Sequence, residues 1–251
     1  MKLRMLVGPL VILCIWQIVA ISGFWSPIFI SSPVKVVTKM LTLLLPGASS
    51  MLPDLAQTIY RTLFGISVAV VVGIPVGLLM GISRRVTDSL EFVIDFGRSM
   101  PATALIPLFV FFFGIGDGAK ISLVSLSCSL VIILNAMYGV SHASPTRRMV
   151  ARTMGITGLR LFRSVILPDA LPQILVGVRT ALSMALVLVV VSEMFLGSGS
   201  GLGRRIYDAQ LMYRIEEMYS CIIIIGIVGY VLNRSFVLLE GWLVHWTGKE
   251  K

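Results

Sequence analysis

The chain has 251 residues, of which 57% are hydrophobic and 13% charged, and its formal net charge is +9. Soluble domains carry about 25% charged residues, so this composition excludes a soluble surface and predicts an integral membrane protein with one membrane domain. Because Lys and Arg gather on the cytoplasmic side of membrane proteins, we interpret the positive charge as a signal of orientation and expect no nucleic-acid partner.

Six apolar stretches approach the length of about 20 residues that a helix needs to cross a bilayer. They are residues 5–24, 58–82, 100–115, 121–140, 174–196 and 219–239. The third is short and contains Pro101 and Pro107, and the second contains Pro75. The first follows Lys2 and Arg4, as in a signal peptide, but it is longer than the roughly 7–15 apolar residues of such a peptide. We therefore expect a retained first span.

The distribution of Lys and Arg predicts that both termini are cytoplasmic. With the N-terminus inside, the inner connections receive twelve of these residues and the outer connections six, Lys120 among them. This bias agrees with the positive-inside rule. We accordingly divide the chain into a first span with an outer segment (1–57), a core of spans (58–240), and a cytoplasmic loop inside that core (141–172). Within the outer segment, the apolar spacing of 33–45 predicts a helix along the membrane interface.

Small residues recur on two of the predicted spans. Glycine occupies every fourth position from Gly73 to Gly81, a pattern that lets two helix backbones approach closely, within the chain or between subunits. On the next long span, Ser125 lies on one face with the serines at 122 and 129. This stripe favours helix packing, and a polar path remains the alternative.

Four ionisable side chains fall within predicted spans: Arg61, Arg179, Glu193 and Arg234. Such groups are costly in a bilayer and are usually paired or face a pathway. Arg61 and Glu193 both lie near the outer ends of their spans, so we expect that they can pair. For Arg61, Arg179 and Glu193, structural pairing and a place on a substrate path both stay open.

The sequence carries no recognisable catalytic constellation. It has two histidines, no HExxH or GxSxG motif, and three cysteines that lie singly in apolar runs, so we predict neither an enzyme nor a metal site. The stretch "GSGSGLG" (197–203) lacks the residues of a phosphate-binding GxxxxGK[ST] loop. We interpret it as a flexible outer loop.

The stretch "ARTMGITGLRLFRSVILPDALP" (151–172) is basic and does not span the membrane. Ile156, Leu159 and Phe162 recur every third residue, and Leu167-Pro168 should end the helix because proline cannot continue the hydrogen-bond ladder. This pattern predicts a short helix below the membrane. The residues alone leave two interpretations equally open, a helix that docks in a partner's groove and a solvated loop helix.

This stretch resembles the cytoplasmic "EAA" loop of ABC importer permeases. In that loop Glu-Ala-Ala is followed by three residues, a glycine, nine residues, an aliphatic residue, any residue and Leu-Pro. Here Gly155 is followed by nine residues and then by VILP (165–168), whereas MVA (149–151) stands in place of Glu-Ala-Ala. The missing acid weakens the polar contacts expected with the partner ATPase. Three further stretches look like the nitrate/sulfonate/taurine/bicarbonate branch of these permeases: "RTLFGISVAVVVGIPVGLLMG" (61–81), "PATALIPLFVFFFGIGDGAK" (101–120) and "VRTALSMALVLVVVSEMFLGSGSGLG" (178–203).

The resemblance implies an all-α membrane protein with the fold of a type I ABC importer transmembrane domain, with about six spans and a cytoplasmic coupling helix within 155–165. The residues that it implies for docking on the ATPase are Ala151, Gly155, Leu159, Phe162, Leu167 and Pro168. It also implies the bacterial inner membrane, a surrounding lipid bilayer, an outer solute-binding protein, a second permease copy, and a cytosolic ATPase that binds ATP and Mg. The chain itself is expected to hold no cofactor.

The function expected from this resemblance is inward transport of a small, anionic solute. One alternative is a permease of the same branch for a vitamin precursor of the thiamine pyrimidine or riboflavin class. The other is an ion-coupled carrier or a channel, which would act without any ATPase and would be expected to hold more acidic residues inside the membrane.

Overall fold

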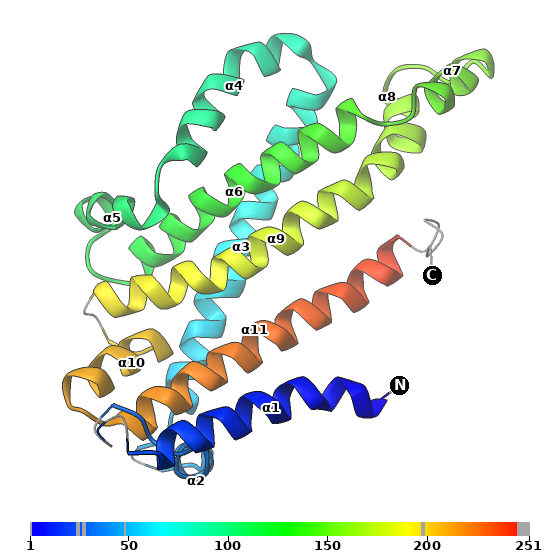
Figure 1. The fold of residues 1–251 in the computed structure, drawn as a ribbon. Helices are drawn as coiled ribbons and strands as arrows, with labels where there is room; N and C mark the ends of the chain where they lie inside the picture. The colour runs from blue at the N-terminus through cyan, green and yellow to red at the C-terminus, as the bar shows by residue number, and fades with distance from the viewer. Residues whose placement is uncertain (1, 24–25, 27–28, 48, 197–198, 245–251) are drawn as a thin grey trace.

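The computed structural model describes residues 2–23, 26, 29–47, 49–196 and 199–244, and this part of the chain folds into helices without a strand (Figure 1). Four helices are long and apolar enough to cross a membrane. They are α3 (Leu52–Ile82), α6 (Asp117–Ser141), α9 (Leu167–Phe195) with the turns before it, and α11 (Ile215–Leu243). These four confirm the predicted spans at 58–82, 121–140, 174–196 and 219–239.

The core lies where α3, α6 and α9 pack together. Its buried side chains include Cys128, Ile132 and Ala136 of α6, and Ala181 and Val189 of α9. Dense packing of this kind lets many weak dispersion contacts add up.

The recurring glycines of α3 lie against α6. A side chain on Gly77 would place its Cβ 2.5 Å from the carbonyl oxygen of Ile133, so only glycine permits the observed approach of the two helices. The glycine pattern therefore serves packing within this chain.

The prediction of a single span at 100–115 is wrong. The structure instead has α4 (Arg84–Ser99), a 3₁₀ turn η1 (Ala102–Leu105) and α5 (Ile106–Phe113), with a bend of 91° between α4 and the η1–α5 segment. The break occurs at Pro101, because the residue before a proline is pushed out of the helical region, and Met100 has φ −75° and ψ 132°. The two parts together are long and apolar enough to form one broken span.

Three further helices lie at the periphery. α1 (Lys2–Ile21) contains the apolar segment Val7–Ile21, which is shorter than the four long spans. It lies beside α11 in Figure 1, and the ring centroids of Trp16 and Tyr219 are 5.7 Å apart. The helix predicted at 33–45 is present as α2 (Pro33–Leu44), and α10 (Leu202–Leu211) follows α9.

The molecule has two distinct ends. Short helices between α6 and α9 form one end, and α10 together with α2 forms the other (Figure 1). We call them the inner end and the outer end, after the orientation that the charge distribution predicts. α1 and α11 are oriented so that the N-terminal end of the first and the C-terminal end of the second point away from the outer end.

Candidate functional site

At the inner end, α7 (Pro145–Thr153) is a short helix that is separate in the chain from both neighbouring spans. Ser144 caps its start by accepting a hydrogen bond from the Arg147 backbone N–H at 3.4 Å, and Pro145 occupies the first turn, as is common at helix N-termini. The helix predicted within 155–165 is present as residues 158–166, but it continues into the following span and is not a separate short helix. The independent helix lies before Gly155, over the positions that correspond to Glu-Ala-Ala.

Gly155 ends α7. Its φ is +76°, and its N–H donates to the Arg152 carbonyl at 3.0 Å, while the N–H of Ile156 donates to the Ala151 carbonyl at 2.9 Å. This pair of bonds defines a Schellman motif, in which the residue after the helix adopts the left-handed conformation that glycine tolerates best. Gly155 thus sets the direction in which the chain leaves α7.

The chain then returns to the membrane in one helix that runs from Gly158 to Phe195. It consists of α8 (Gly158–Leu161), a π turn η2 (Phe162–Ile166) and α9. The prediction that Leu167-Pro168 ends the helix is wrong. The Leu167 N–H bonds to the carbonyl of Phe162, five residues back, and this shift of hydrogen-bond register places Pro168 in the first turn of α9, where a missing N–H is tolerated.

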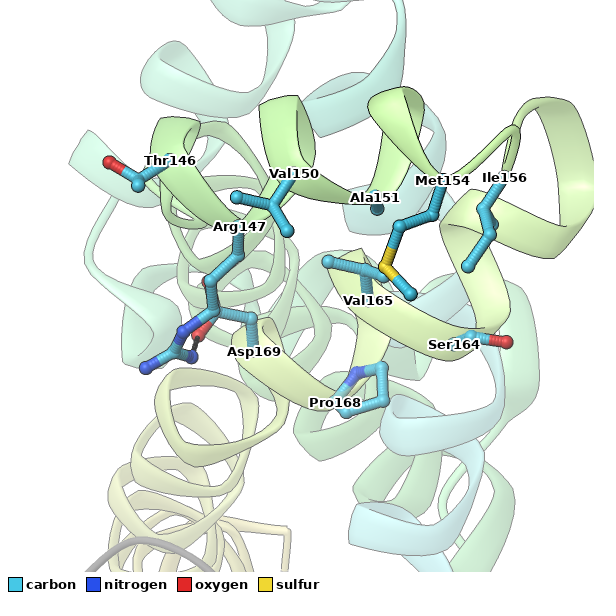
Figure 2. Close-up of a pocket in the computed structure, with 10 residues that line it drawn as sticks. All are labelled: Thr146, Arg147, Val150, Ala151, Met154, Ile156, Ser164, Val165, Pro168 and Asp169. Carbon is cyan, nitrogen blue, oxygen red and sulfur yellow. Dashed lines mark hydrogen bonds and ion pairs between the residues drawn. The ribbon is translucent and has the colours of Figure 1, made fainter.

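Asp169 fastens α7 to the start of α9. Its carboxylate accepts the Ser144 backbone N–H at 2.6 Å and forms an ion pair with Arg147. The Arg148 guanidinium donates to the Val140 carbonyl at the end of α6. Between α7 and α9 lies a pocket of about 460 Å³, into which Val150, Met154 and Val165 point (Figure 2).

The implied docking residues have different surroundings. Leu159 is 64% exposed, and Gly155 is also exposed. Ala151, on the inward face of α7, is buried. The remaining three are partly buried: Phe162, Leu167 and Pro168. Two apolar residues of this region that the resemblance did not name, Met149 and Met154, are 68% and 73% exposed.

At the outer end, Arg61 of α3 lies at the centre of a buried ion network. Its Nη1 is 2.6 Å from Glu193 Oε1 of α9, and its Nη2 is 2.7 Å from Asp117 Oδ1 of α6. The side chains of Arg61 and Glu193 are 3% and 0% exposed. The predicted Arg61–Glu193 pair is thus confirmed, and Asp117 extends it to a third helix.

The glycine-rich stretch closes over Glu193. The Glu193 carboxylate accepts the Gly203 N–H at 2.9 Å and the Thr58 hydroxyl at 2.9 Å, and Thr58 Oγ1 in turn accepts the Leu202 N–H at 3.0 Å. A Cβ on Gly201 would lie 2.4 Å from the Glu193 carboxyl carbon. The interpretation as a flexible loop is therefore wrong for 201–203, while residues 197 and 198 lie outside the described part.

Lys120 also departs from its predicted place. The count of outer charges treated it as a loop residue, but its side chain is fully buried in the first turn of α6. It therefore belongs to the interior of the outer end, on the same helix as Asp117.

A second ion cluster surrounds Arg205 of α10. Its guanidinium lies 2.7 Å from Glu217 and 3.0 Å from Asp54, and it also donates to the Ser50 carbonyl at 2.8 Å. Burial disfavours the charged form, but the hydrogen bonds and charges of Glu217 and Asp54 outweigh this effect and raise the pKa of Arg205 above its ordinary value. This cluster ties α10 to the starts of α3 and α11.

The other two pathway candidates do not join the Arg61 network. The Ser125 hydroxyl lies 3.1 Å from the Gly65 carbonyl oxygen of α3 and 2.7 Å from the Ile121 carbonyl oxygen, which favours its packing role. Arg179 is exposed along α9, and its Nε donates to Asn233 Oδ1 of α11 at 2.9 Å.

The chain matches, over residues 73–249, the family described as binding-protein-dependent transport system inner membrane component, and it belongs to that family. It is 31% identical over 95% of its length to the taurine transport system permease protein TauC of Escherichia coli strain K12, covering 88% of that protein. It is 32% identical to a putative aliphatic sulfonates transport permease SsuC of Bacillus subtilis strain 168, over 95% of this chain and 85% of the relative. It is 29% identical to the nitrate import permease NrtB of a Synechocystis strain, over 96% and 89%.

Solved structures confirm the predicted fold. A chain described as an inward-facing conformation of the MetNI methionine ABC transporter superposes with a TM-score of 0.69 at 19% identity, over 77% of this chain and 95% of that one. A chain of an amino acid ABC transporter has a TM-score of 0.63 at 21% identity, over 86% and 99%. The protein therefore has the all-α fold of an ABC importer transmembrane domain.

Proposed function

We propose that this chain is the permease subunit of an ATP-driven importer for a small solute with an oxoanion group, of the sulfonate, taurine, nitrate or bicarbonate class. The proposal rests mainly on the exposure of apolar side chains at the inner end. There a capped helix, α7, and the exposed start of the α8–α9 helix present Met149, Met154 and Leu159 to the outside. A membrane protein that leaves such residues uncovered beyond its spans has a partner surface to offer.

The partner at this end is a cytosolic ATPase that binds ATP and Mg, and the permease itself binds no cofactor. These 251 residues contain no GxxxxGK[ST] loop, and the proposal assigns ATP hydrolysis to the partner. In this arrangement α7 is the coupling helix. Gly155 and Leu159 belong to the docking surface, whereas Ala151, Phe162, Leu167 and Pro168 support it from beneath.

The positive charge of the docking surface indicates which side chains the ATPase groove should carry. Segment 144–166 contains five arginines and no acidic residue, and where related loops carry glutamate this chain has Met149. Arg147 is taken by Asp169, while Arg152, Arg160 and Arg163 are exposed. The matching groove therefore has an apolar floor and acidic edges, since oppositely charged partner surfaces guide association.

The remaining partners follow from the same function. The solute-binding protein approaches the outer end, a second permease copy completes the path, and both termini face the cytoplasm of a bacterial cell. The substrate class rests on the names of the taurine, aliphatic sulfonate and nitrate relatives. Sulfonate and nitrate share one feature, a negative charge spread over several oxygens.

The test is co-purification of the tagged chain from its native membranes in mild detergent, with mass spectrometry of the bound proteins. Leu159→Asp places a charge on the docking surface and should remove the ATPase from the complex. The matched control is Leu211→Asp, which makes the same change at a leucine 61% exposed on α10, at the other end of the molecule. The control should keep the ATPase.

Retention of the ATPase by Leu159→Asp, or absence of any ATPase from the unaltered chain while solute still enters vesicles without ATP, would overturn the proposal. Gly155→Pro supplies an independent check. It should abolish uptake and leave the amount of protein in the membrane unchanged.

A further inference from the structure

Arg179 is an arginine near the middle of α9 and inside the predicted span at 174–196. The charged residues of α9 are Asp169, Arg179 and Glu193, and the outer two are bound by arginines near the helix ends. At 1.5 Å per residue, Arg179 lies about 18 Å along the axis from Leu167 and about 21 Å from Glu193. Within the predicted span at 174–196, Arg179 lies five residues, about 8 Å along the axis, from the inner edge.

The hydrogen bond between Arg179 and Asn233 uses one donor of the guanidinium and the oxygen of the amide. Arginine can donate hydrogen bonds but cannot accept them, so the Asn233 amide turns its oxygen toward Arg179 Nε, at 2.9 Å. This bond does not use the amide NH₂ of Asn233 or the terminal NH₂ groups of the guanidinium, so these donors are available to a ligand. Together they form a positively charged group of N–H donors, which is the arrangement that binds a planar or tetrahedral oxoanion in bidentate fashion.

The exposed flank of α9 is polar around Arg179 and apolar on either side, where Val176 and Val187 are 46% and 61% exposed. Thr180 and Ser183 are exposed beside Arg179, and their hydroxyls lie within hydrogen-bond distance of carbonyls of their own helix. The neighbouring flank is different, because Leu175, Val178 and Leu182 line an apolar groove that α9 forms with α3 and α11. Ionisable residues inside membrane spans face the bundle interior or a water-filled cavity far more often than lipid. The polar part of this flank, around Arg179, therefore faces water or solute, and the groove lined by Leu175 faces hydrocarbon or protein.

We propose that the Arg179 guanidinium, oriented by Asn233, is an oxoanion-binding site on the translocation path. This inference rests on the proposed function, because it assigns the sulfonate or nitrate group of the solute to a residue of the permease. Arg179 binds the group that passes, and Asn233 is a positioning residue that holds the guanidinium in place.

The experiment uses a cysteine at position 183, one turn from Arg179, in the full complex embedded in nanodiscs. Ser183→Cys is introduced with Cys14→Ser, because Cys14 is exposed whereas Cys128 and Cys221 are buried. The cysteine is treated in parallel with sulfonatoethyl methanethiosulfonate, which is an anionic sulfonate, and with the cationic trimethylammonioethyl reagent. The chain with Cys14→Ser alone gives the background rate.

We expect the anionic reagent to react faster than the cationic one, and Arg179→Gln to lower the anionic-to-cationic rate ratio about tenfold, the scale on which one sign of charge concentrates counter-ions in a cleft. Arg179→Lys should retain most of the ratio because it keeps the charge. Arg84→Gln is the matched control, since it removes an exposed arginine at the start of α4 and should leave the ratio unchanged.

No reaction with either reagent means that lipid or a second subunit covers this flank, and a ratio that survives Arg179→Gln means that another group attracts the anion. Either result overturns the site. Uptake separates this inference from the proposed function. Arg179→Gln should lower ATP-dependent entry of taurine, ethanesulfonate or nitrate, whichever the complex transports, at least tenfold while ATP hydrolysis and ATPase co-purification persist. Loss of the ATPase from the unaltered complex would instead contradict the importer proposal.

Discussion

The outer and inner ends of this protein differ in whether their characteristic side chains are buried or exposed. At the outer end, the buried Arg61 binds both Glu193, which is also buried, and the half-exposed Asp117, and the chain folds back over Glu193 at Gly203. At the inner end, α7 is fastened to the bundle through Asp169, while Met154 and Leu159 remain exposed. The first region pairs its charged groups within the chain, and the second leaves apolar side chains exposed.

The two ends should therefore respond differently to substitution. A change in the outer network should act first on folding, because buried charges are costly once their partners are gone. A change at the inner end should act first on association and uptake, because its exposed residues contribute little to the fold. The three variants below test that division, in decreasing order of their expected effect on stability.

Arg61→Met should cause the largest loss. It leaves Glu193 buried without its guanidinium partner, and breaking one member of a buried ion pair costs about 3–5 kcal/mol. We expect a marked fall in the unfolding midpoint of the detergent-purified chain, followed by size-exclusion of heated samples. Adding Glu193→Gln and Asp117→Asn should recover part of the loss. An unchanged midpoint for Arg61→Met would show that the network is not a source of stability.

Gly155→Ala should have an intermediate effect on stability and a larger one on association. A residue with a side chain pays about 1–2 kcal/mol in the left-handed conformation that Gly155 adopts at φ +76°. The exit from α7 should shift, so the ATPase recovered by co-purification should fall severalfold at an unchanged amount of membrane protein. Gly155→Asn should retain more of it, because asparagine tolerates this conformation better. Equal recovery from all three chains would contradict a structural role for the Schellman motif.

Arg98→Ala should have the smallest effect. Its guanidinium lies 3.1 Å from Asp95 in an exposed pair on α4, and pairs of this kind often contribute nothing measurable. The unfolding midpoint should match that of the unaltered chain within error. A fall as large as that of Arg61→Met would mean that exposure and burial do not separate the two kinds of ion pair.

The sequence was sufficient where a pattern depends on one helix at a time. Apolar length located α3, α6, α9 and α11, and the shared depth of Arg61 and Glu193 predicted their pairing. Gly155 was singled out by its spacing before the Leu-Pro pair, and its positive φ explains why glycine stands there.

It was insufficient where the outcome depends on contacts between distant segments. Nothing local indicates that Gly201 and Gly203 pack against Glu193, because Gly201 reads as a loop glycine until the α9 carboxylate lies against it. The same holds for Asp169, whose partners are 22 and 25 residues earlier. The sequence also did not predict the π turn before Leu167. Pro168 alone indicates the end of a helix, but the shift in hydrogen-bond register lets the helix continue.

One helix, from Gly158 to Phe195, connects the inner end to the outer end and contains a single π turn. At 1.5 Å per residue its 38 residues form a lever about 57 Å long, so a tilt of about 5° about one end displaces the other by about 5 Å. Leu159 is near one tip and Glu193 near the other. In the proposed importer, a movement imposed on Leu159 would be carried along this helix toward the outer ion network, and the π turn at Phe162–Ile166 is where the helix would bend instead.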